Sequence, residues 1–264
     1  ACEKKAISGQ YLIKWKNGKV SVVSGLDEKS FLNTYLSDAK SDVLLAEPNY
    51  KVDFLDALPV NVLDEGLTVP MADGHDPENW GPKSIRASSA WQADVYGEGV
   101  LVAVIDNGTD IRHPQLKNAI YINRGEVGLD ANGTDKSTNG SDDDGNGYID
   151  DVNGWNYVSK SPLKEPKENQ ADPKDNESFL HGTHVAGIIA AQHNSAALFG
   201  VAPKSKLLPL RFIGNSGGNV GDAIFAIQYS MEQAKRDGMP LVINASWGGP
   251  DCSTILRSVI DLAS

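Results

Sequence analysis

Apolar residues gather in three short runs, at residues 100–105, 206–212 and 241–247, and longer segments with helical spacing alternate with these runs. Runs of this kind are typical of strands that are buried on both faces of a parallel sheet. Residues 181–192 and 220–236 have the spacing of helices. The alternation predicts an α/β fold in which helices cover both faces of a parallel sheet.

The first 54 residues predict a separate small α/β unit. Two strands, at residues 11–15 and 19–23, precede a helix that Asp27 can cap, and a strand at 42–54 is interrupted by Pro48. Residues 55–82 are rich in proline and glycine and predict a linker. The larger unit is then expected at residues 83–264, with a last helix that Ser253 caps and a sheet that the chain leaves unfinished.

Composition narrows the class of protein. The 264 residues carry a formal net charge of −11, which argues against nucleic acid as a partner and fits a secreted protein or one that binds cations. No apolar run approaches the roughly 18 residues of a membrane-spanning helix. The two cysteines, Cys2 and Cys252, are too few for a disulfide framework. They could pair with each other or with a partner chain, and Cys2 could instead carry the lipid of a cell-surface lipoprotein.

Two residues are candidates for catalysis. Asp106 follows the first buried strand, at the carboxyl end where α/β sheets bind ligands, although an aspartate there could also hold a metal ion or a ribose. His181 begins a predicted helix, whose dipole disfavours protonation and suits a neutral general base. The alternatives are a capping histidine, or a metal pair with His184 that lacks the usual i,i+4 spacing.

Two glycine-rich segments could bind a peptide. Ser246, Trp247 and Gly248 end the third buried strand, and Gly217 with Gly218 could offer a second backbone edge opposite them. Exposed edges of this kind hold peptides by strand addition. The alternative is that both segments are only turns.

An acidic loop within residues 130–154 predicts a calcium site. Oxygen side chains alternate in a D-x-D-x-N-G pattern that matches the first half of an EF-hand loop, with Gly147 at the sharp turn. Asn153 stands where an EF-hand has its closing glutamate, so the expected role of the ion is stability. A solvated acidic loop is the alternative. The expected ligands are Asp142, Asp144, Asn146, the carbonyl of Tyr148, and Asp150 or Asp151.

Together these segments resemble the subtilisin-like serine proteases, the subtilases. The segments that carry the resemblance are VAVIDNG at 102–108, HGTHVAG at 181–187, GVAP at 200–203 and VINASWGG at 242–249. The resemblance implies that Asp106 orients the imidazole of His181, which acts as general base for a serine endopeptidase. It also implies that residues 246–248 and 217–218 line the two sides of the substrate cleft, and that calcium stabilises the protein.

Residues 1–54 resemble the subtilase propeptide, a ferredoxin-like unit that acts as folding chaperone and intramolecular inhibitor. Maturation would then cut the linker of a zymogen. The nucleophilic serine and the oxyanion asparagine of the family have no counterpart in this chain, and Asn244 belongs to the substrate-binding strand. We therefore expect this chain to be inactive alone and to need a C-terminal fragment of the same precursor. The alternative is a catalytically dead fragment that binds peptides or inhibits a protease.

Overall fold

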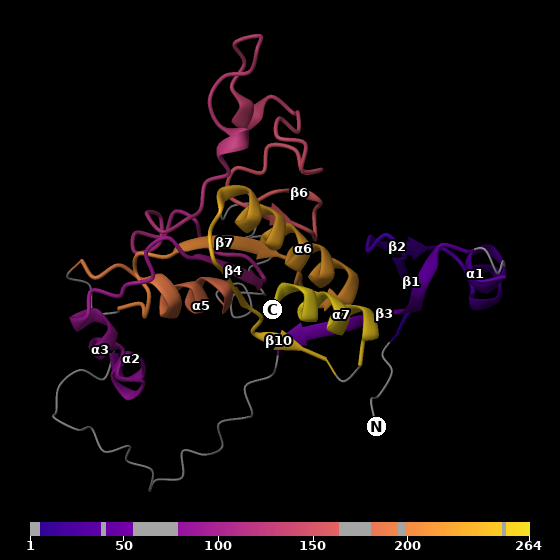
Figure 1. The fold of residues 1–264 in the computed structure, drawn as a ribbon, viewed down its shortest axis with the longest axis horizontal. Helices are drawn as coiled ribbons and strands as arrows, with labels where there is room; N and C mark the ends of the chain where they lie inside the picture. Colours follow the sequence, from indigo (N-terminus) through magenta and orange to yellow (C-terminus); the bar gives the residue numbers. More distant parts are fainter. Residues whose placement is uncertain (1–5, 38–40, 55–78, 164–180, 195–198, 250–251) are drawn as a thin grey trace, which may run out of the picture.

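The computed structural model describes residues 6–37, 41–54, 79–163, 181–194, 199–249 and 252–264, which form two units (Figure 1). The larger unit is built on a sheet with the strand order β6-β5-β7-β4-β9. Strand β4 pairs in parallel with β7 and with β9, as predicted, whereas β6 pairs antiparallel with β5, so the sheet as a whole is mixed. The strands are β4 (Leu101–Asp106), β5 (Trp155–Asn156), β6 (Ser161–Pro162), β7 (Lys206–Arg211) and β9 (Leu241–Asn244).

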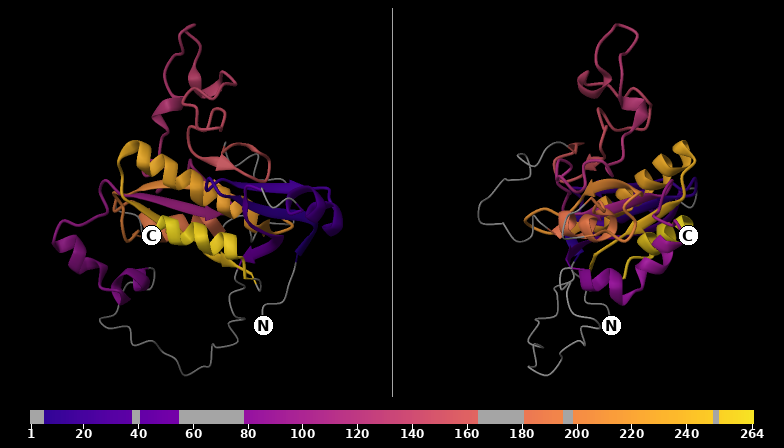
Figure 2. Two further views of the ribbon diagram at one scale, coloured as in Figure 1. Left: turned by 45° about the vertical axis from the view of Figure 1, so that its right-hand side comes forward. Right: turned by 90° about the vertical axis from the view of Figure 1, so that its left-hand side faces the viewer.

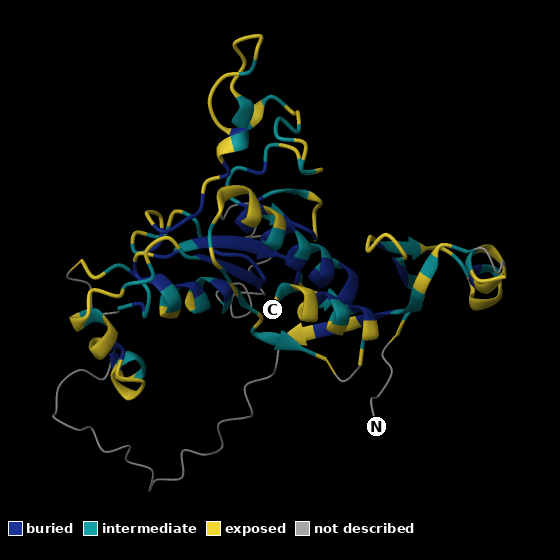
Figure 3. Ribbon diagram, in the orientation of Figure 1, coloured by how far each residue is buried: buried dark blue, intermediate teal, exposed yellow. Residues whose placement is uncertain are grey.

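Helices cover both faces of this sheet, as the alternating pattern predicts. Leu101, Ala103 and Ile105 of β4 face one way, into a core shared with α6 (Val220–Asp237) and α7 (Thr254–Ala263). The intervening residues of β4, Val102 and Val104, face a second core with α5 (His181–Ala190). All six residues of β4 are buried, and the central strands are the darkest part of Figure 3. Because both faces are packed, β4 can carry a long apolar run.

The smaller unit consists of β1 (Ala6–Trp15), β2 (Val20–Ser24), α1 (Glu28–Tyr35) and β3 (Val43–Phe54). Its antiparallel strands have the order β3-β1-β2. This ββαβ unit has one helix, whereas a ferredoxin-like fold has two helices and four strands, so the described residues do not bear out the ferredoxin-like expectation. Asp27 caps α1 by accepting from the backbone N–H of Ser30, as predicted.

Pro48 does not interrupt the last strand of this unit, contrary to expectation. Strand β3 runs unbroken from Val43 to Phe54, and Pro48 lies opposite Tyr11 at a shift in register. Gly9, with φ of +68°, allows β1 to bulge there. A proline at a bulge costs no ladder hydrogen bond, and for this reason the strand tolerates it.

Two features of the larger unit lie outside its sheet. Helices α2 (Trp80–Ser84) and α3 (Ala87–Gln92) precede β4, and α2 spans the predicted boundary at residue 83. The segment between β4 and β5 contains two short 3₁₀ turns, Arg124–Glu126 and Lys136–Thr138, and projects away from the sheet (Figure 2). Among the described helices, none combines the length and apolar character that crossing a bilayer requires. The predicted linker, apart from residues 79–82, lies outside the described residues.

Candidate active site and acidic cluster

Asp106 and His181, 75 residues apart in sequence, are in contact at the carboxyl end of the sheet. Asp106 is the last residue of β4 and His181 the first residue of α5. The imidazole Nδ1 lies 2.9 Å from Oδ1 and 3.0 Å from Oδ2 of the carboxylate. When Nδ1 carries the proton of this hydrogen bond, the neutral ring has its lone pair on Nε2, which is the arrangement of a general base.

Burial defines the electrostatics of this pair. The Asp106 side chain is 0% exposed, and the His181 side chain is 35% exposed. Burial raises the pKa of Asp106, while the hydrogen bonds from His181 and from the backbone N–H of Asn107 oppose that rise. His184 is exposed, and the described His, Cys, Asp and Glu residues contain no metal-binding group that includes His181 and His184. The metal-pair alternative therefore has no support.

Gly182 allows α5 to approach β4 closely enough for this contact. A Cβ at residue 182 would lie 2.2 Å from the carbonyl oxygen of Gly108 and 3.1 Å from the Cβ of Asp106. Because the close neighbour is backbone, it cannot move aside cheaply. The small residue is thus required where the end of β4 meets the start of α5.

We expect Gly182→Ala to lower the free energy of unfolding by about 3 kcal/mol, because overpacking forces the two backbones apart. Thermal unfolding measures the change. The matched control is Gly187→Ala in the same helix, where an added Cβ meets nothing within 4 Å. Alanine is the better helix former by about 1 kcal/mol, so this variant should be as stable as the parent or more stable. Equal losses in both variants would contradict the explanation.

The two glycine-rich segments flank the end of β3. Strand β8 (Gly218–Asn219) pairs antiparallel with Lys51 and Val52, and β10 (Trp247–Gly248) pairs antiparallel with the last two residues of β3. Ser246 directly precedes β10, and Gly217 directly precedes β8. The structure therefore brings together, around one extended segment, all five residues predicted to bind a peptide: Gly217, Gly218, Ser246, Trp247 and Gly248.

Side-chain packing accompanies the pairing of β3 with β8 and β10. Val52 is 6% exposed and belongs to the core cluster that includes Phe212, against which Trp247 packs. The Phe212 and Trp247 rings meet edge to face with centroids 4.8 Å apart. A Cβ at Gly217 would lie 2.9 Å from the carbonyl oxygen of Val52, so glycine is needed for the backbones to meet. Val52, Phe212 and Trp247 thus belong to one apolar cluster.

The smaller unit also caps two helices of the larger unit. The Glu47 carboxylate accepts from the backbone N–H groups of Thr254, at 2.9 Å, and Ile255, at 3.3 Å, at the start of α7. The Asn49 Oδ1 accepts from the N–H of Gly221, at 3.1 Å, in the first turn of α6. Unpaired amides at a helix start favour an acceptor, and a carboxylate most of all. These contacts fix β3 on the larger unit.

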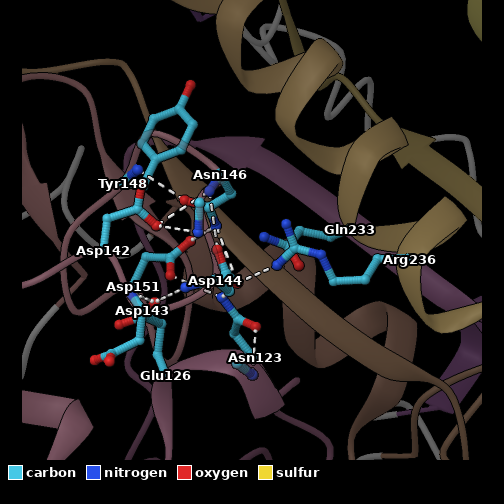
Figure 4. A network of polar contacts seen from close by, with 12 residues as sticks. Asn123, Glu126, Asp142, Asp143, Asp144, Asn146, Tyr148, Asp151, Gln233 and Arg236 are labelled. Atoms are coloured by element: carbon cyan, nitrogen blue, oxygen red, sulfur yellow. Dashed lines mark hydrogen bonds and ion pairs between the residues drawn. The ribbon is translucent and has the colours of Figure 1, made fainter. Parts of the chain in front are cut away.

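The acidic loop forms a compact cluster of three carboxylates (Figure 4). Glu126, Asp142 and Asp144 each place one carboxylate oxygen within 4.8 Å of the others. Glu126 is 0% exposed, and its Oε2 has no hydrogen-bond partner among the described residues. Its Oε1 accepts from the N–H groups of Asp143 and Asp144. Burial raises the pKa of Glu126, and a buried, unpartnered carboxylate oxygen is suited to a cation.

The other predicted ligands surround this cluster without joining the three. Asn146 bridges Asp144 and Asp151 through its amide, and buried Asp151 accepts from the Tyr229 hydroxyl. The backbone N–H of Tyr148 donates to Asn146, and its ring packs on Trp155. Asp150 Oδ1 accepts from the N–H of Gly140. Of the predicted ligands, Asp142 and Asp144 belong to the three-carboxylate centre. The others lie around it and are held by hydrogen bonds.

Sequence reasoning missed two residues of this cluster. Glu126 lies 16 residues before Asp142, in a 3₁₀ turn outside the recognised motif. Arg236, at the end of α6, forms an ion pair with Asp144 from 92 residues away. The dense aspartate run indicates that a positive charge lies close by, but neither the position of Arg236 nor the approach of Glu126 can be derived from it, because both depend on the tertiary fold.

Comparison with known proteins gives the family. The Subtilase family profile matches residues 97–261, well over half of the chain. This chain belongs to the subtilase family. It is 30% identical over 250 residues to the minor extracellular protease Vpr of Bacillus subtilis, covering 90% of this chain. It is 34% identical over 182 residues to the major intracellular serine protease of the same organism, covering 68% of this chain.

A structural relative shares the fold across both units. Fervidolysin from Fervidobacterium pennivorans, a keratinolytic enzyme related to subtilisin, superposes with a TM-score of 0.62 at 20% identity and covers 98% of this subtilase chain. The chain spans 26% of the length of Vpr, 44% of the intracellular protease and 38% of the fervidolysin structure. Cys252 is disulfide-bonded, and Cys2 lies outside the described residues.

Proposed function

We propose that this subtilase chain supplies the aspartate and the histidine of a serine endopeptidase. The observation that supports the proposal is the hydrogen bond between buried Asp106 and Nδ1 of His181, at 2.9 Å. Asp106 holds the imidazole in the tautomer whose Nε2 takes the proton of a serine hydroxyl, and it stabilises the imidazolium that results. The substrate is a protein or peptide chain that lies between β8 and β10 as an added strand.

The serine nucleophile is proposed to lie on a C-terminal part of the same precursor. An intact-mass spectrum of the denatured sample tests it, together with labelling by a fluorophosphonate probe. A second, labelled polypeptide would support a complete protease. A single unlabelled species near 28.3 kDa would favour the alternative, a catalytically dead peptide-binding or inhibitory protein.

The N-terminal unit is proposed to be the propeptide and intramolecular inhibitor of this protease. Its last strand lies between the two edges that would bind a substrate, and its Glu47 and Asn49 cap two helices of the larger unit. A substrate and this strand therefore compete for the same backbone groups. Cleavage within residues 55–75 would release the unit from the zymogen.

We expect Val52→Asp to release this strand, because a buried carboxylate without a partner replaces an apolar contact. Amide hydrogen exchange in β8 and β10 should accelerate by about 100-fold or more as those strands lose their partner. Lys51→Asp is the matched control, since the Lys51 side chain is exposed and the same acid is introduced one residue away. Unchanged exchange in Val52→Asp would contradict the docked-inhibitor proposal.

Calcium is the proposed stabilising cofactor, held by Glu126, Asp142 and Asp144. The residues fit a hard cation, because all three offer carboxylate oxygens and the Glu126 Oε2 is buried without a partner among the described residues. Asn146 and Asp151 would orient these ligands through their hydrogen bonds. The ion would neutralise repulsion in the loop and would take no part in peptide hydrolysis. Secretion is proposed as well, since calcium is abundant outside cells.

A further inference from the structure

Asn107 connects the two catalytic segments through two hydrogen bonds. It is 5% exposed and directly follows Asp106. Its backbone N–H donates to Oδ1 of Asp106 at 2.7 Å. Its side-chain Oδ1 accepts from the backbone N–H of Gly182 at 2.9 Å, in a buried position. One residue thus binds the carboxylate on one side and the backbone next to His181 on the other.

The position of the second bond matters because of where α5 begins. His181 is the first described residue of α5, and the N–H of the next residue, Gly182, donates out of the helix to Asn107. Asn107 supplies an acceptor from the neighbouring strand end, at the residue that follows His181. This bond fixes the backbone that carries the imidazole relative to the carboxylate that the imidazole must meet.

We propose that Asn107 is a positioning residue for the catalytic pair, an inference that rests on the proposed protease function. The neutral amide suits the place, because an alkyl side chain would leave the N–H of Gly182 buried without an acceptor. The geometry of the Asp106–His181 hydrogen bond then depends on the acceptor at residue 107. Asn107 touches neither the substrate nor the transferred proton.

A second tie between the same segments provides a control. The Thr183 hydroxyl accepts from the backbone N–H of Asp110 at 2.9 Å. Like the Asn107 hydrogen bond, this one joins the loop after β4 to α5. Its donor is the backbone of Asp110, which is not adjacent to the Asp106 carboxylate. If these hydrogen bonds only stabilised the fold, both would have the same role. If Asn107 positions the catalytic pair, only its hydrogen bond should affect the contact between Asp106 and His181.

The test uses the whole chain with isotope-labelled histidine, whose five residues include His181. The proton on Nδ1 of His181 should give a low-field resonance that exchanges slowly with water. Asn107→Leu has a similar shape but no acceptor, and we expect its exchange to be about tenfold faster or more. Asn107→Asp keeps an acceptor oxygen and should retain the slow resonance. Thr183→Val should also retain it, even if its unfolding temperature falls.

The outcomes separate the two proposals. If Asn107→Leu retains the parent exchange rate, or if Asn107→Asp loses the resonance as Asn107→Leu does, the acceptor has no positioning role. Equal acceleration in Thr183→Val would also overturn it. A parent chain without the resonance would overturn the proposed catalytic pair together with this inference. If Asn107→Leu does not fold, Asn107→Ala, which also lacks the acceptor for the N–H of Gly182, takes its place in the same comparison.

Discussion

Replacing Asp106 by asparagine is expected to lower kcat of the assembled protease by about 10⁴-fold, with KM within about threefold of the parent. The carboxylate accepts from Nδ1 of His181 at 2.9 Å and therefore keeps the lone pair on Nε2. An asparagine that donates to Nδ1 holds the opposite tautomer, in which Nε2 carries the proton and cannot accept another. Steady-state hydrolysis of a peptide substrate measures the effect.

The control for this prediction is Asp94→Asn, which makes the same chemical change at an exposed residue. Asp94 has φ of +57°, a conformation that asparagine adopts readily, so its stability should not fall. Activity of Asp94→Asn should equal that of the parent. If Asp106→Asn retained more than about a tenth of the parent kcat, Asp106 would not orient the base, and the proposed mechanism would be wrong.

In the larger unit, the apolar runs and helix caps expected from the local sequence are present in the structure. The apolar run at residues 100–105 predicts β4, which begins one residue later and ends at Asp106. The spacing at residues 220–236 predicts α6, which ends at Asp237 and is capped by Gly238 in the left-handed conformation with φ of +64°. Ser253 caps α7 as predicted, by accepting from the N–H of Leu256. Each of these features depends on residues close together in sequence.

Departures from prediction occur where distant residues decide the structure. Pro48 stays within β3 because a bulge at Gly9 of β1 absorbs the shift in register. The sequence predicts a helix after Asp27 but not how much of it is buried: α1 buries only Phe31, while Leu32 and Leu36 are 45% and 42% exposed. A helical spacing shows which side chains share a face, but the neighbouring strands decide how much of that face they cover.

The candidate sites also differ in whether local sequence or distant residues determine them. A motif of seven residues contains His181, and Asp106 follows a strand that the pattern predicts, so sequence alone indicates both. Glu126 escapes prediction because it enters the acidic cluster from a separate 3₁₀ turn. Gly125 beside it allows this approach, since a Cβ there would lie 2.4 Å from the Cβ of Asp144. The spacing of a motif predicts only the ligands within one loop. The remaining ligands of a cation site can come from other segments that the tertiary fold places close to that loop.

Removal of calcium is expected to lower the stability of the folded protein. At a free calcium concentration of 100 times Kd, binding stabilises the folded state by about 2.7 kcal/mol. For a chain of this size the loss corresponds to a fall of about 5–10 °C in Tm. Scanning calorimetry in excess calcium and in a chelator measures the difference. Magnesium should restore less of it, because carboxylates at this spacing suit the larger ion better.

Glu126→Gln tests whether the residue that the motif missed is a ligand. The amide keeps the shape of the side chain but removes a negative charge, so calcium affinity should fall by about 10-fold to 100-fold and the stabilisation should shrink with it. Terbium luminescence, sensitised by the Tyr148 ring of the same loop, reports binding without any activity measurement. Asp143→Asn is the matched control, because this substitution removes the same charge from the same loop. Asp143 lies outside the three-carboxylate centre, and its carboxylate accepts a hydrogen bond from the Asn139 side chain. Equal loss of affinity in the two variants would mean that net charge alone attracts the ion and that Glu126 is not a ligand.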